Sequence, residues 1–401
     1  MKLSLHKAYS LLFFALCFSL SFIGDRLYAI PNGINILLVL LFPFVIDKQI
    51  FIKNMLKKPM VCFLAFLLYV LLKSIFLADF LDDLSIIKKL FQVLLLIILS
   101  FGLKRPALEQ LKSGTIFGCL FAVIYSLIKI VIIFTETGSF NFSNGPIINE
   151  TLPVQRLYLG LLCVISLILV IDRFFKMNKK AYLFLAILFG SFVFLISARI
   201  AIVTTVIVLL YYVNLKTHKK HKLLALLSLV LFTFLFFLKN PNLSKRTLHT
   251  EYKNNSSFFE KFLTHEPRAL IWEYSYSVLN QNNIIFGDGF EGVQSQLLKK
   301  YEKIDDLNKR NWFIQEQFNS HNQYLDILLS QGIIGLTLFL IFLYFTYKES
   351  LISNTNFLLF LTLAIFLVIY NNFHRVLGVF IFAIMFCIIT RSKKPKLDEQ
   401  C

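Results

Sequence analysis

Long apolar runs separated by short polar segments recur along most of the 401-residue chain. Most runs hold roughly 14–20 residues, close to what an α-helix needs to cross a hydrocarbon layer about 30 Å thick. Their continuous hydrophobicity is typical of helices surrounded by lipid. The pattern predicts about twelve spans, over residues 8–24, 33–46, 59–77, 86–103, 114–134, 156–171, 181–197, 200–213, 221–238, 322–346, 356–371 and 376–390.

The composition supports the same fold class, an all-α polytopic membrane protein. The chain is 57% hydrophobic and 16% charged, with a mean hydropathy of +0.70 and 45 phenylalanines. A soluble domain cannot bury that much apolar surface. No repeat or linker divides the chain, so a single membrane domain over residues 1–401 is expected. No cleavage pattern follows the first run, which predicts a retained helix rather than a removed signal peptide.

The net charge of +18 is distributed unevenly between the two faces of the membrane. With the N-terminus in the cytoplasm, the cytoplasmic segments hold 22 Lys and Arg, and the short loops on the other face hold seven. Such asymmetry is the positive-inside rule. It predicts that both termini are cytoplasmic, and it accounts for the basic surplus without a nucleic-acid partner.

One long segment, residues 239–320, interrupts the series between spans nine and ten. Its 82 residues carry 11 basic and 10 acidic side chains, and the orientation above places it outside the cytoplasm. Loops of this length in a compact protein are usually functional. The segments "EPRALIWEYSYSVLNQ" and "GVQSQLLKKYEKI" are predicted to be helical, and "FGDGF" is predicted to be a glycine turn. A third stretch, "NWFIQEQFN", leads to His321.

Residues 181–213 form an apolar stretch with one charge, Arg199. As one helix they would be about 50 Å long, which exceeds the membrane thickness. Both flanks are strongly basic, which places both ends in the cytoplasm. The chain is therefore predicted to reverse near "SAR", with Arg199 at the outer membrane surface.

Three residues on that outer face are the main candidates for chemistry. Arg199 runs against the charge bias, which favours a phosphate ligand over a residue that only anchors the helix at the interface. From spacing alone, Arg268 is a solvated arginine near a helix start. His321 and Asn322 precede an apolar helix, so His321 is either a cap or a base. A helix N-terminus keeps the imidazole neutral, which favours proton acceptance near pH 7.

The remaining outward-facing candidates are secondary. Arg156 begins span six, and His374 and Arg375 lie in "NNFHR". With no partner identifiable in the sequence, each is interpreted first as an interfacial anchor. Five of the six cysteines lie in apolar spans, so no disulfide framework or metal-ligand spacing is expected.

Together these features resemble the O-antigen ligase family, membrane glycosyltransferases that use undecaprenyl-linked donors. The matching stretches are "SARIA" at 197–201, "RALIWEYSYSVL" leading to "IIFGDGF" at 268–290, and "HNQYLDILLSQGIIGL" at 321–336. The order of the motifs and the position of the long loop also agree. Asp288 departs from the pattern, because an uncharged residue is expected between the two glycines.

The resemblance implies a role for each matching residue. Arg199 and Arg268 would bind the pyrophosphate of the donor, and His321 would be the general base for the acceptor hydroxyl. No metal or cofactor is implied. The donor would be a glycan on undecaprenyl pyrophosphate, and the acceptor a lipid A-core sugar or a growing glycan, at the periplasmic face of the bacterial inner membrane. Gly332 and Gly335 are expected to allow close helix approach or a groove for the lipid tail.

Other functions remain open from the sequence. A glycan polymerase and a protein O-oligosaccharyltransferase share the donor chemistry and differ in the acceptor. A twelve-helix transporter or flippase is less favoured, because transporters show internal repeats and polar groups near the membrane midplane. A non-catalytic scaffold leaves the outward-facing arginines unexplained.

Overall fold

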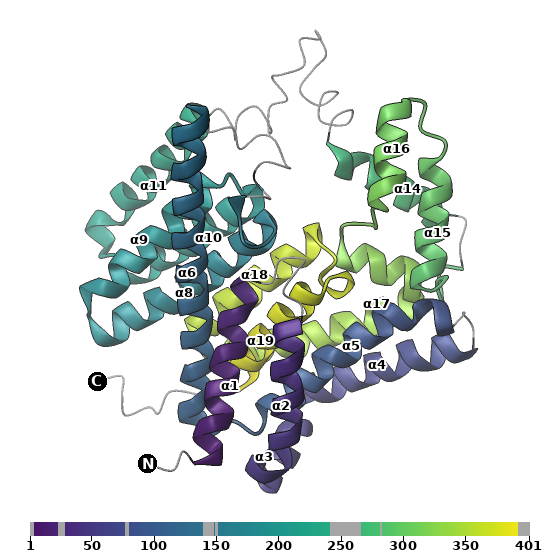
Figure 1. Ribbon diagram of the computed structural model, residues 1–401, viewed down its shortest axis with the longest axis horizontal. Helices are drawn as coiled ribbons and strands as arrows, with labels where there is room; N and C mark the ends of the chain where they lie inside the picture. Colours follow the sequence, from purple (N-terminus) through teal and green to yellow (C-terminus); the bar gives the residue numbers. More distant parts are fainter. Residues whose placement is uncertain are drawn as a thin grey trace. The chain divides into compact units, whose positions relative to one another are not determined.

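The computed structural model describes residues 4–22, 29–76, 80–138, 148, 151–240, 266–280 and 283–391. Within these residues every regular element is a helix, which agrees with the predicted fold class (Figure 1). The chain divides into two compact units. Unit 1 comprises Met1–Val45 and Leu103–Lys261, and unit 2 comprises Ile46–Gly102 and Phe262–Cys401.

Unit 1 is built around close helix pairs. Helix α1 packs along α6, where a Cβ on Gly114 would come within 2.5 Å of the Phe14 carbonyl oxygen. Gly114 therefore permits an approach that a side chain would block. The elements of this unit are α1 (Leu5–Ser19), η1 (Leu20–Phe22), α2 (Ala29–Val45), α6 (Arg105–Thr137), α8 (Arg156–Met177), α9 (Lys180–Leu195), α10 (Arg199–Lys216) and α11 (Lys219–Lys239).

The predicted reversal near "SAR" is confirmed. Helix α9 ends at Leu195, and α10 begins at Arg199 after Ser197, which has a φ of 52°. A Cβ on Gly160, near the start of α8, would come within 3.1 Å of Ala198 Cβ and 2.8 Å of Ala201 Cβ. The starts of α8 and α10 are thus adjacent, which requires α9 to run back between them.

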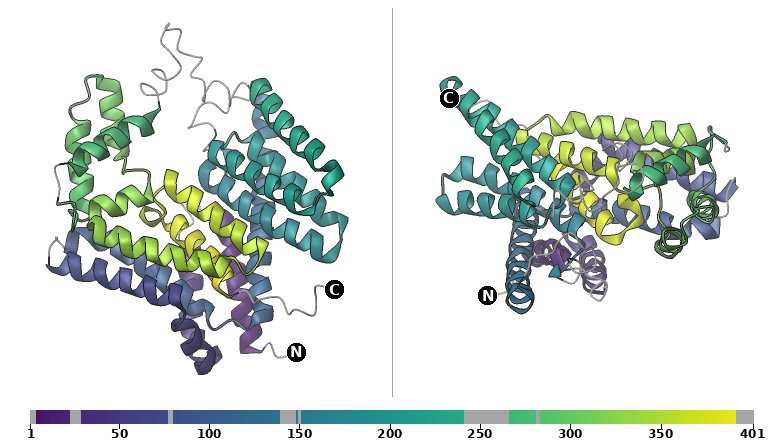
Figure 2. Two further views of the ribbon diagram at one scale, coloured as in Figure 1. Left: turned by 180° about the vertical axis from the view of Figure 1, so that it is seen from behind. Right: turned by 90° about the horizontal axis from the view of Figure 1, so that it is seen from above.

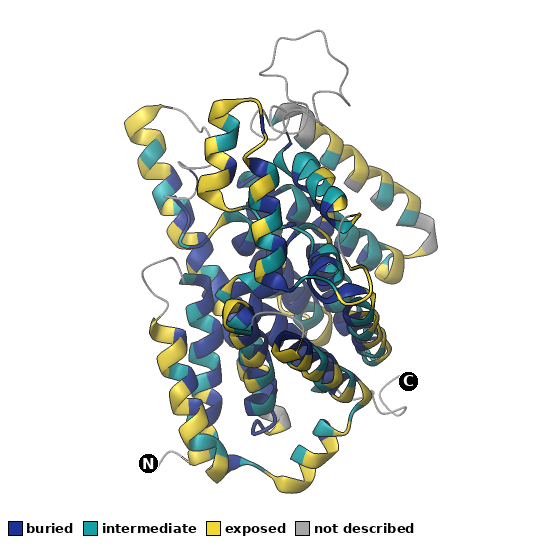
Figure 3. Ribbon diagram, turned by 90° about the vertical axis from the view of Figure 1, so that its right-hand side faces the viewer, coloured by how far each residue is buried: buried dark blue, intermediate teal, exposed yellow. Residues whose placement is uncertain are grey.

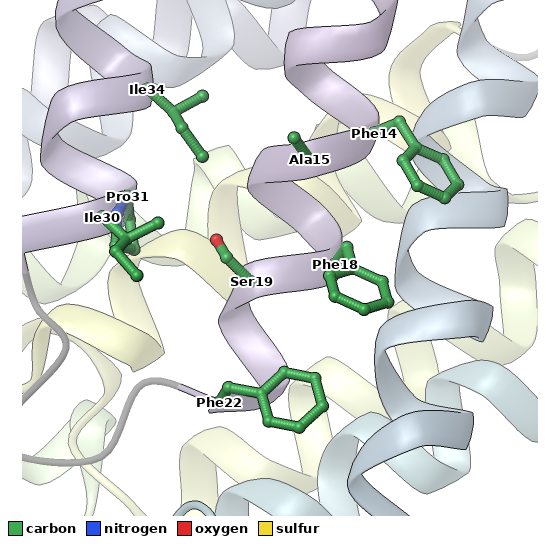
Figure 4. A pocket seen from close by; sticks show the side chains of 8 residues that line it. All are labelled: Phe14, Ala15, Phe18, Ser19, Phe22, Ile30, Pro31 and Ile34. Carbon is green, nitrogen blue, oxygen red and sulfur yellow. The ribbon is translucent and has the colours of Figure 1, made fainter.

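An apolar groove of about 480 Å³ lies between α1 and α2 (Figure 4). Its lining contains no charged side chain, so it provides no group for acid–base chemistry. A surface of this kind in a membrane helix pair suits contact with acyl chains. The lining residues are Phe14, Ala15, Phe18, Ser19, Phe22, Ile30, Pro31 and Ile34.

Unit 2 is organised around α17. Phenylalanines pair between α4 and α17, with ring centroids 5.0 Å apart for Phe63–Phe342 and 5.4 Å apart for Phe66–Phe339. Helices α4 and α17 lie side by side in Figures 1 and 2. The elements of this unit are α3 (Lys48–Met55), α4 (Lys58–Phe76), α5 (Phe80–Ser100), α14 (Pro267–Leu279), α15 (Phe290–Tyr301), α16 (Leu307–Glu316), α17 (Gln323–Ser350), α18 (Asn354–Ile369), η2 (Asn372–His374) and α19 (Val376–Arg391).

The described part of the long segment folds as predicted. Helices α14 and α15 coincide with the two predicted helices, and Pro267 occupies the first turn of α14. Helix α16 overlaps the first part of "NWFIQEQFN". The three helices enclose a small core that includes Ile271, Leu297, Tyr301 and Phe313, all at 0% exposure. Each helix turns buried residues inward and exposed residues outward (Figure 3). This group of three helices is called the α14–α16 cluster below.

One predicted helix is broken. The predicted span 322–346 coincides with α17, and Gly332 interrupts this helix with φ 66° and ψ −172°. Gly332 was expected to allow close packing of helices. Instead it interrupts α17. Gly335 does meet the expectation: a Cβ there would come within 3.1 Å of the Tyr69 ring on α4.

Each of the twelve predicted spans overlaps a helix of the structure. Six of the described helices are long and apolar enough to cross a membrane, and a bent pair, Ala29–Val45 with Lys48–Met55, would make a seventh. The remaining apolar helices are shorter or more charged. The structure therefore supports a polytopic helical membrane protein, and the number twelve stays a prediction.

Candidate active site

His321 lies on the short segment between α16 and α17 and has a strained backbone. Its φ of 46° is in the left-handed region, which is uncommon for a residue other than glycine. The backbone N–H of His321 donates to Asn319 Oδ1 at 3.2 Å. The cap of α17 is not His321 but Asn322, whose Oδ1 accepts from the N–H groups of Tyr324 and Leu325 at 3.0 and 3.1 Å. Of the "HN" pair, Asn322 caps α17, and the His321 imidazole takes no part in capping.

The α14–α16 cluster holds this segment by its carbonyl groups. Trp272 Nε1 donates to the Ser320 carbonyl at 3.1 Å, and Tyr301 Oη donates to the Phe318 carbonyl at 3.0 Å. Gln294 Nε2 donates to the Gln317 carbonyl at 2.9 Å. Three side chains from two helices therefore fix the chain just before His321. The predicted helices have a clear structural role, which is to position this segment.

A buried polar layer lies beneath the segment. Asp326, 3% exposed, accepts a hydrogen bond from His374, with 2.9 Å between Oδ2 and Nε2. Ser320 Oγ lies 3.4 Å from Asp326 Oδ1, and Asn371 Nδ2 donates to Ser320 Oγ at 3.0 Å. Gln323 Oε1 accepts from the backbone N–H of Phe373 at 3.0 Å. These bonds join the start of α17 to residues 371–374.

This layer corrects the prediction for "NNFHR". The expectation that His374 has no partner is wrong, because the partner is Asp326, a lone acidic residue in an apolar stretch. A single carboxylate in such a stretch is a signal for a buried polar site, and it was overlooked in the sequence. Asn371, Ser320 and Gln323 were also missed, because amides and hydroxyls are common and carry no pattern of their own.

A small polar pocket opens beside His321, with a volume of about 50 Å³. The ring centroid of His321 lies 5.5 Å from that of Phe318 and 6.0 Å from that of Tyr370. Arg375 is exposed and also lines the pocket, so its interpretation as an interfacial anchor is replaced by a place beside the candidate base. The lining residues are Glu316, Gln317, Phe318, Asn319, His321, Tyr370, Asn371 and Arg375.

The electrostatic surroundings keep His321 neutral. Its pKa is lowered to about 3, first because burial disfavours the charged ring and then because Arg268, Arg375 and His374 lie near it. The ring therefore carries a free lone pair throughout the physiological range. The place at a helix N-terminus predicted the same direction, but the causes are burial and the neighbouring cations.

Arg268 is the second residue of α14 and is half-buried. Its Nη1 lies 3.3 Å from Oε1 of Glu266, which is 5% exposed. The guanidinium is thus held near His321 by a buried carboxylate. Arg268 is therefore not the solvated loop arginine that spacing alone indicated, and its role toward the donor stays a prediction.

The glycine turn 284–289 packs backbone to backbone against the break in α17. The N–H groups of Asp288 and Gly289 donate to the carbonyls of Leu329 and Ser330 at 3.1 and 2.9 Å. Ile333 N–H donates to the Ile284 carbonyl at 2.9 Å. The turn therefore provides hydrogen-bond partners for backbone carbonyl and N–H groups that lose their helical partners at the break. The Asp288 carboxylate accepts a hydrogen bond from Gln296 Nε2, so it links the glycine turn to α15.

Two side chains of α4 bind backbone carbonyls at the break in α17. Tyr69 Oη donates to the Gln331 carbonyl at 2.9 Å, and Lys73 Nζ donates to the Ser330 carbonyl. Lys73 lies within α4 and is 3% exposed. A cation at carbonyls that end a helical segment is favourable, because the helix dipole is negative there.

Two of the predicted arginines lie in unit 1. Arg199 is the first residue of α10 and Arg156 the first residue of α8, and both are half-buried. The contact of Gly160 with Ala198 and Ala201 brings these two helix starts together. The predicted site residues thus form two groups. One group lies in unit 2 and consists of His321, Arg268, His374 and Arg375. The other lies in unit 1 and consists of Arg156 and Arg199. Among the described residues no three His, Cys, Asp or Glu side chains are grouped so that they can hold a metal ion.

Fold and site together define a polytopic helical membrane protein. A neutral histidine precedes its broken helix α17, and two arginines from other segments, Arg268 and Arg375, lie near that histidine. Residues 183–340 match the family model described as O-antigen ligase, so this part of the chain carries the O-antigen ligase domain and the resemblance drawn from the sequence is confirmed. The matched range includes "SARIA", the glycine turn and the "HN" motif. No curated protein matches the chain.

Proposed function

We propose that the chain is a membrane glycosyltransferase that moves a glycan from undecaprenyl pyrophosphate to a hydroxyl group of a lipid A-core sugar. The observation that carries the proposal is the neutral His321 beside Arg268 and Arg375 within the O-antigen ligase match. The reaction takes place at the periplasmic face of the bacterial inner membrane, with both termini in the cytoplasm. This orientation follows from the distribution of basic residues.

In the proposed reaction His321 is the general base. The O–H bond of the acceptor breaks and its proton passes to the imidazole, while the acceptor oxygen bonds to the anomeric carbon. The bond between that carbon and the phosphate oxygen breaks, and undecaprenyl pyrophosphate leaves with the electron pair. A base placed for such a transfer contributes about 10²–10⁴-fold to the rate.

Arginines supply the charge that stabilises the leaving pyrophosphate. Arg268 is proposed as one ligand, because its guanidinium is half-buried and lies close enough to His321 to lower the pKa of that ring. Arg199 is proposed as a second ligand, as the family resemblance implies, with Arg156 as an auxiliary residue at the adjacent helix start. Guanidinium groups bind phosphate oxygens in pairs, so no metal ion is required for this role.

Donor binding also prepares the base. A pyrophosphate beside Arg268 offsets a positive charge that lowers the pKa of His321. The proton affinity of the imidazole therefore rises when the donor is bound, and the base becomes stronger when a proton has to be removed. Without the donor, His321 stays a weak base, which limits unproductive activation of water.

The test uses the purified full chain in lipid nanodiscs, with a glycan on undecaprenyl pyrophosphate and a lipid A-core acceptor. Transfer is expected for the native protein, also with a chelator present, and is expected to be lost in His321→Ala. The matched control is His218→Ala, a histidine at the start of α11 outside the proposed site, and it should transfer normally. Wild-type turnover by His321→Ala would remove the base assignment.

A second experiment distinguishes ligase from polymerase, since both use the same donor. After deletion of the gene, the surface polysaccharide of the cell is analysed. Loss of all glycan from lipid A-core supports the ligase. Capping of lipid A-core by single repeat units assigns the chain to the polymerases instead.

A further inference from the structure

Two buried polar atoms of the His321 pocket have no hydrogen-bond partner among the residues that the structure describes. They are Nδ1 of His321 itself and Oδ1 of Asn371, a residue that is only 2% exposed. Both residues line the same small pocket. Buried polar atoms in native proteins are nearly always paired, so these two atoms point to a ligand that supplies the missing partners.

The orientation of the Asn371 amide follows from its neighbours. Asn371 Nδ2 donates to Ser320 Oγ at 3.0 Å. The Ser320 hydroxyl in turn lies 3.2 Å from the Asn322 carbonyl and 3.4 Å from Asp326 Oδ1, both of which only accept. Rotating the amide by 180° would leave those acceptors without the Ser320 proton. The oxygen of Asn371 is therefore the atom without a partner.

The missing partner of Asn371 Oδ1 is a hydrogen-bond donor. A phosphate group at neutral pH offers mainly acceptor oxygens, which would face the amide oxygen unfavourably. A hydroxyl group both donates and accepts, so it matches Asn371 Oδ1 and also either tautomer of the neutral His321 ring. The Asn371 side of the pocket therefore suits an alcohol better than a phosphate oxygen.

The shape and lining of the pocket point to a sugar alcohol. A volume of about 50 Å³ is more than one water molecule needs, and it leaves room for one edge of a sugar ring. The rings of Phe318 and Tyr370 lie near His321, and aromatic faces attract the slightly positive C–H groups of a sugar. Glu316, Gln317 and Asn319 surround the pocket with further hydrogen-bonding groups.

We propose that this pocket is the acceptor-sugar subsite, in which Asn371 Oδ1 accepts a hydrogen bond from a hydroxyl next to the one that His321 deprotonates. The assignment deepens the proposed function and rests on it. It also separates the two substrates: the acceptor binds on the Asn371 side of His321, and the pyrophosphate of the donor binds outside this pocket. Asn371 acts here as a specificity residue and takes no part in the proton transfer.

The first experiment measures KM for the acceptor and for the lipid-linked donor separately, with the full chain in nanodiscs. Asn371→Ala is expected to raise the acceptor KM roughly tenfold or more and to change the donor KM less than about twofold. The control is Asn372→Ala, whose side chain is equally buried but does not line the pocket, and it should leave both constants unchanged. A raised donor KM with an unchanged acceptor KM overturns the assignment.

Acceptors that each lack one hydroxyl give a sharper test. The native protein should discriminate against one particular deoxy acceptor, and Asn371→Ala should lose that discrimination. Equal discrimination by both proteins against every analogue overturns the proposal. If Asn371→Ala does not fold, Asn371→Leu keeps the side-chain volume without its polar atoms and takes its place.

A binding experiment keeps the subsite testable if no transfer is observed. Saturation-transfer NMR with methyl hexosides should detect binding to the native chain and weaker binding to Asn371→Ala. Inorganic pyrophosphate should not displace the hexoside. Binding of the hexoside without turnover would contradict the proposed function but support the subsite, whereas displacement by pyrophosphate would assign the pocket to the donor.

Discussion

Oδ2 of Asp326, on the first turn of α17, lies 2.9 Å from Nε2 of His374, which is 48 residues later in the chain. Both side chains are largely buried, with 4% and 15% exposure. The bond ties the helix that follows His321 to the turn that precedes Arg375. The geometry of the pocket therefore depends on a pair of residues that do not line it.

Replacing Asp326 with Asn should loosen this connection. The amide keeps the shape of the carboxylate but weakens the bond to His374, at an expected cost of about 1–3 kcal/mol in folding free energy. Thermal unfolding of the purified protein checks this as a lower Tm. Asp82→Asn is the control, because Asp82 is exposed and its replacement should leave the Tm unchanged. Equal Tm values for both variants would contradict the role of the pair.

Gly332→Ala should disrupt the contact between the glycine turn and the break in α17. The new Cβ would come within 2.1 Å of the Ile285 carbonyl oxygen, at a φ of 66° that alanine rarely adopts. Strain and overpacking together are expected to cost roughly 3 kcal/mol or more. Gly190→Ala is the matched control, since nothing lies within 4 Å of its added Cβ, and it should be neutral or slightly stabilising. The measured quantity is the yield and Tm of folded protein.

Arg375→Gln should make His321 easier to protonate. Removing one of the charges that lower the pKa of the ring raises that pKa from about 3 towards its ordinary value. Because protonated His321 cannot act as a base, the acidic limb of the kcat/KM profile should move to higher pH. Arg310→Gln, a change on α16, should leave the limb in place. A profile that is identical in the two variants would remove Arg375 from the surroundings of the base.

The same shift has a consequence for stability. The folded chain binds a proton at His321 only near pH 3, whereas an unfolded histidine binds one near its ordinary pKa of about 6.5. Between these values the unfolded state binds more protons, so this group lowers the stability of the fold as the pH falls. Acid sensitivity in this window should be smaller in Arg375→Gln.

Arg199→Lys should impair transfer although it keeps the charge. Lysine lacks the planar fork that holds two phosphate oxygens, so a loss of about tenfold or more in kcat/KM is expected. Arg173→Lys, on the same unit but bonded to Glu109 and Ser113, serves as the control and should transfer normally. Full activity of Arg199→Lys would show that a paired grip on phosphate is unnecessary.

Several features of the site were predictable because they depend on local sequence. The reversal at "SAR" follows from the length of the apolar stretch and its basic flanks, and Pro267 marks the start of α14. The place of His321 before α17 predicted a neutral ring, but the lowered pKa is due to burial and to Arg268, Arg375 and His374, which the fold brings near. The glycine turn was also evident from its residues, although the segment it packs against was not.

Other features depend on contacts between distant segments. Nothing near Gly332 in the sequence shows that residues 284–289 will occupy the break, because glycine suits both close packing and left-handed backbone. Asp326 and His374 become partners only when α17 and η2 meet. Arg375 could not be told from an interfacial anchor until the fold placed it beside His321.

Hydrophobic periodicity was sufficient to define the helices and the membrane class, because lipid requires long apolar segments whose backbone bonds are satisfied internally. The distribution of lysine and arginine along those segments predicts their orientation, which stays a prediction. The broken helix, the buried Asp326–His374 pair and the pocket at Asn371 were decided by tertiary packing. Hydrogen-bond partners and burial are properties of segments brought together in space, and no local pattern encodes which segments will meet.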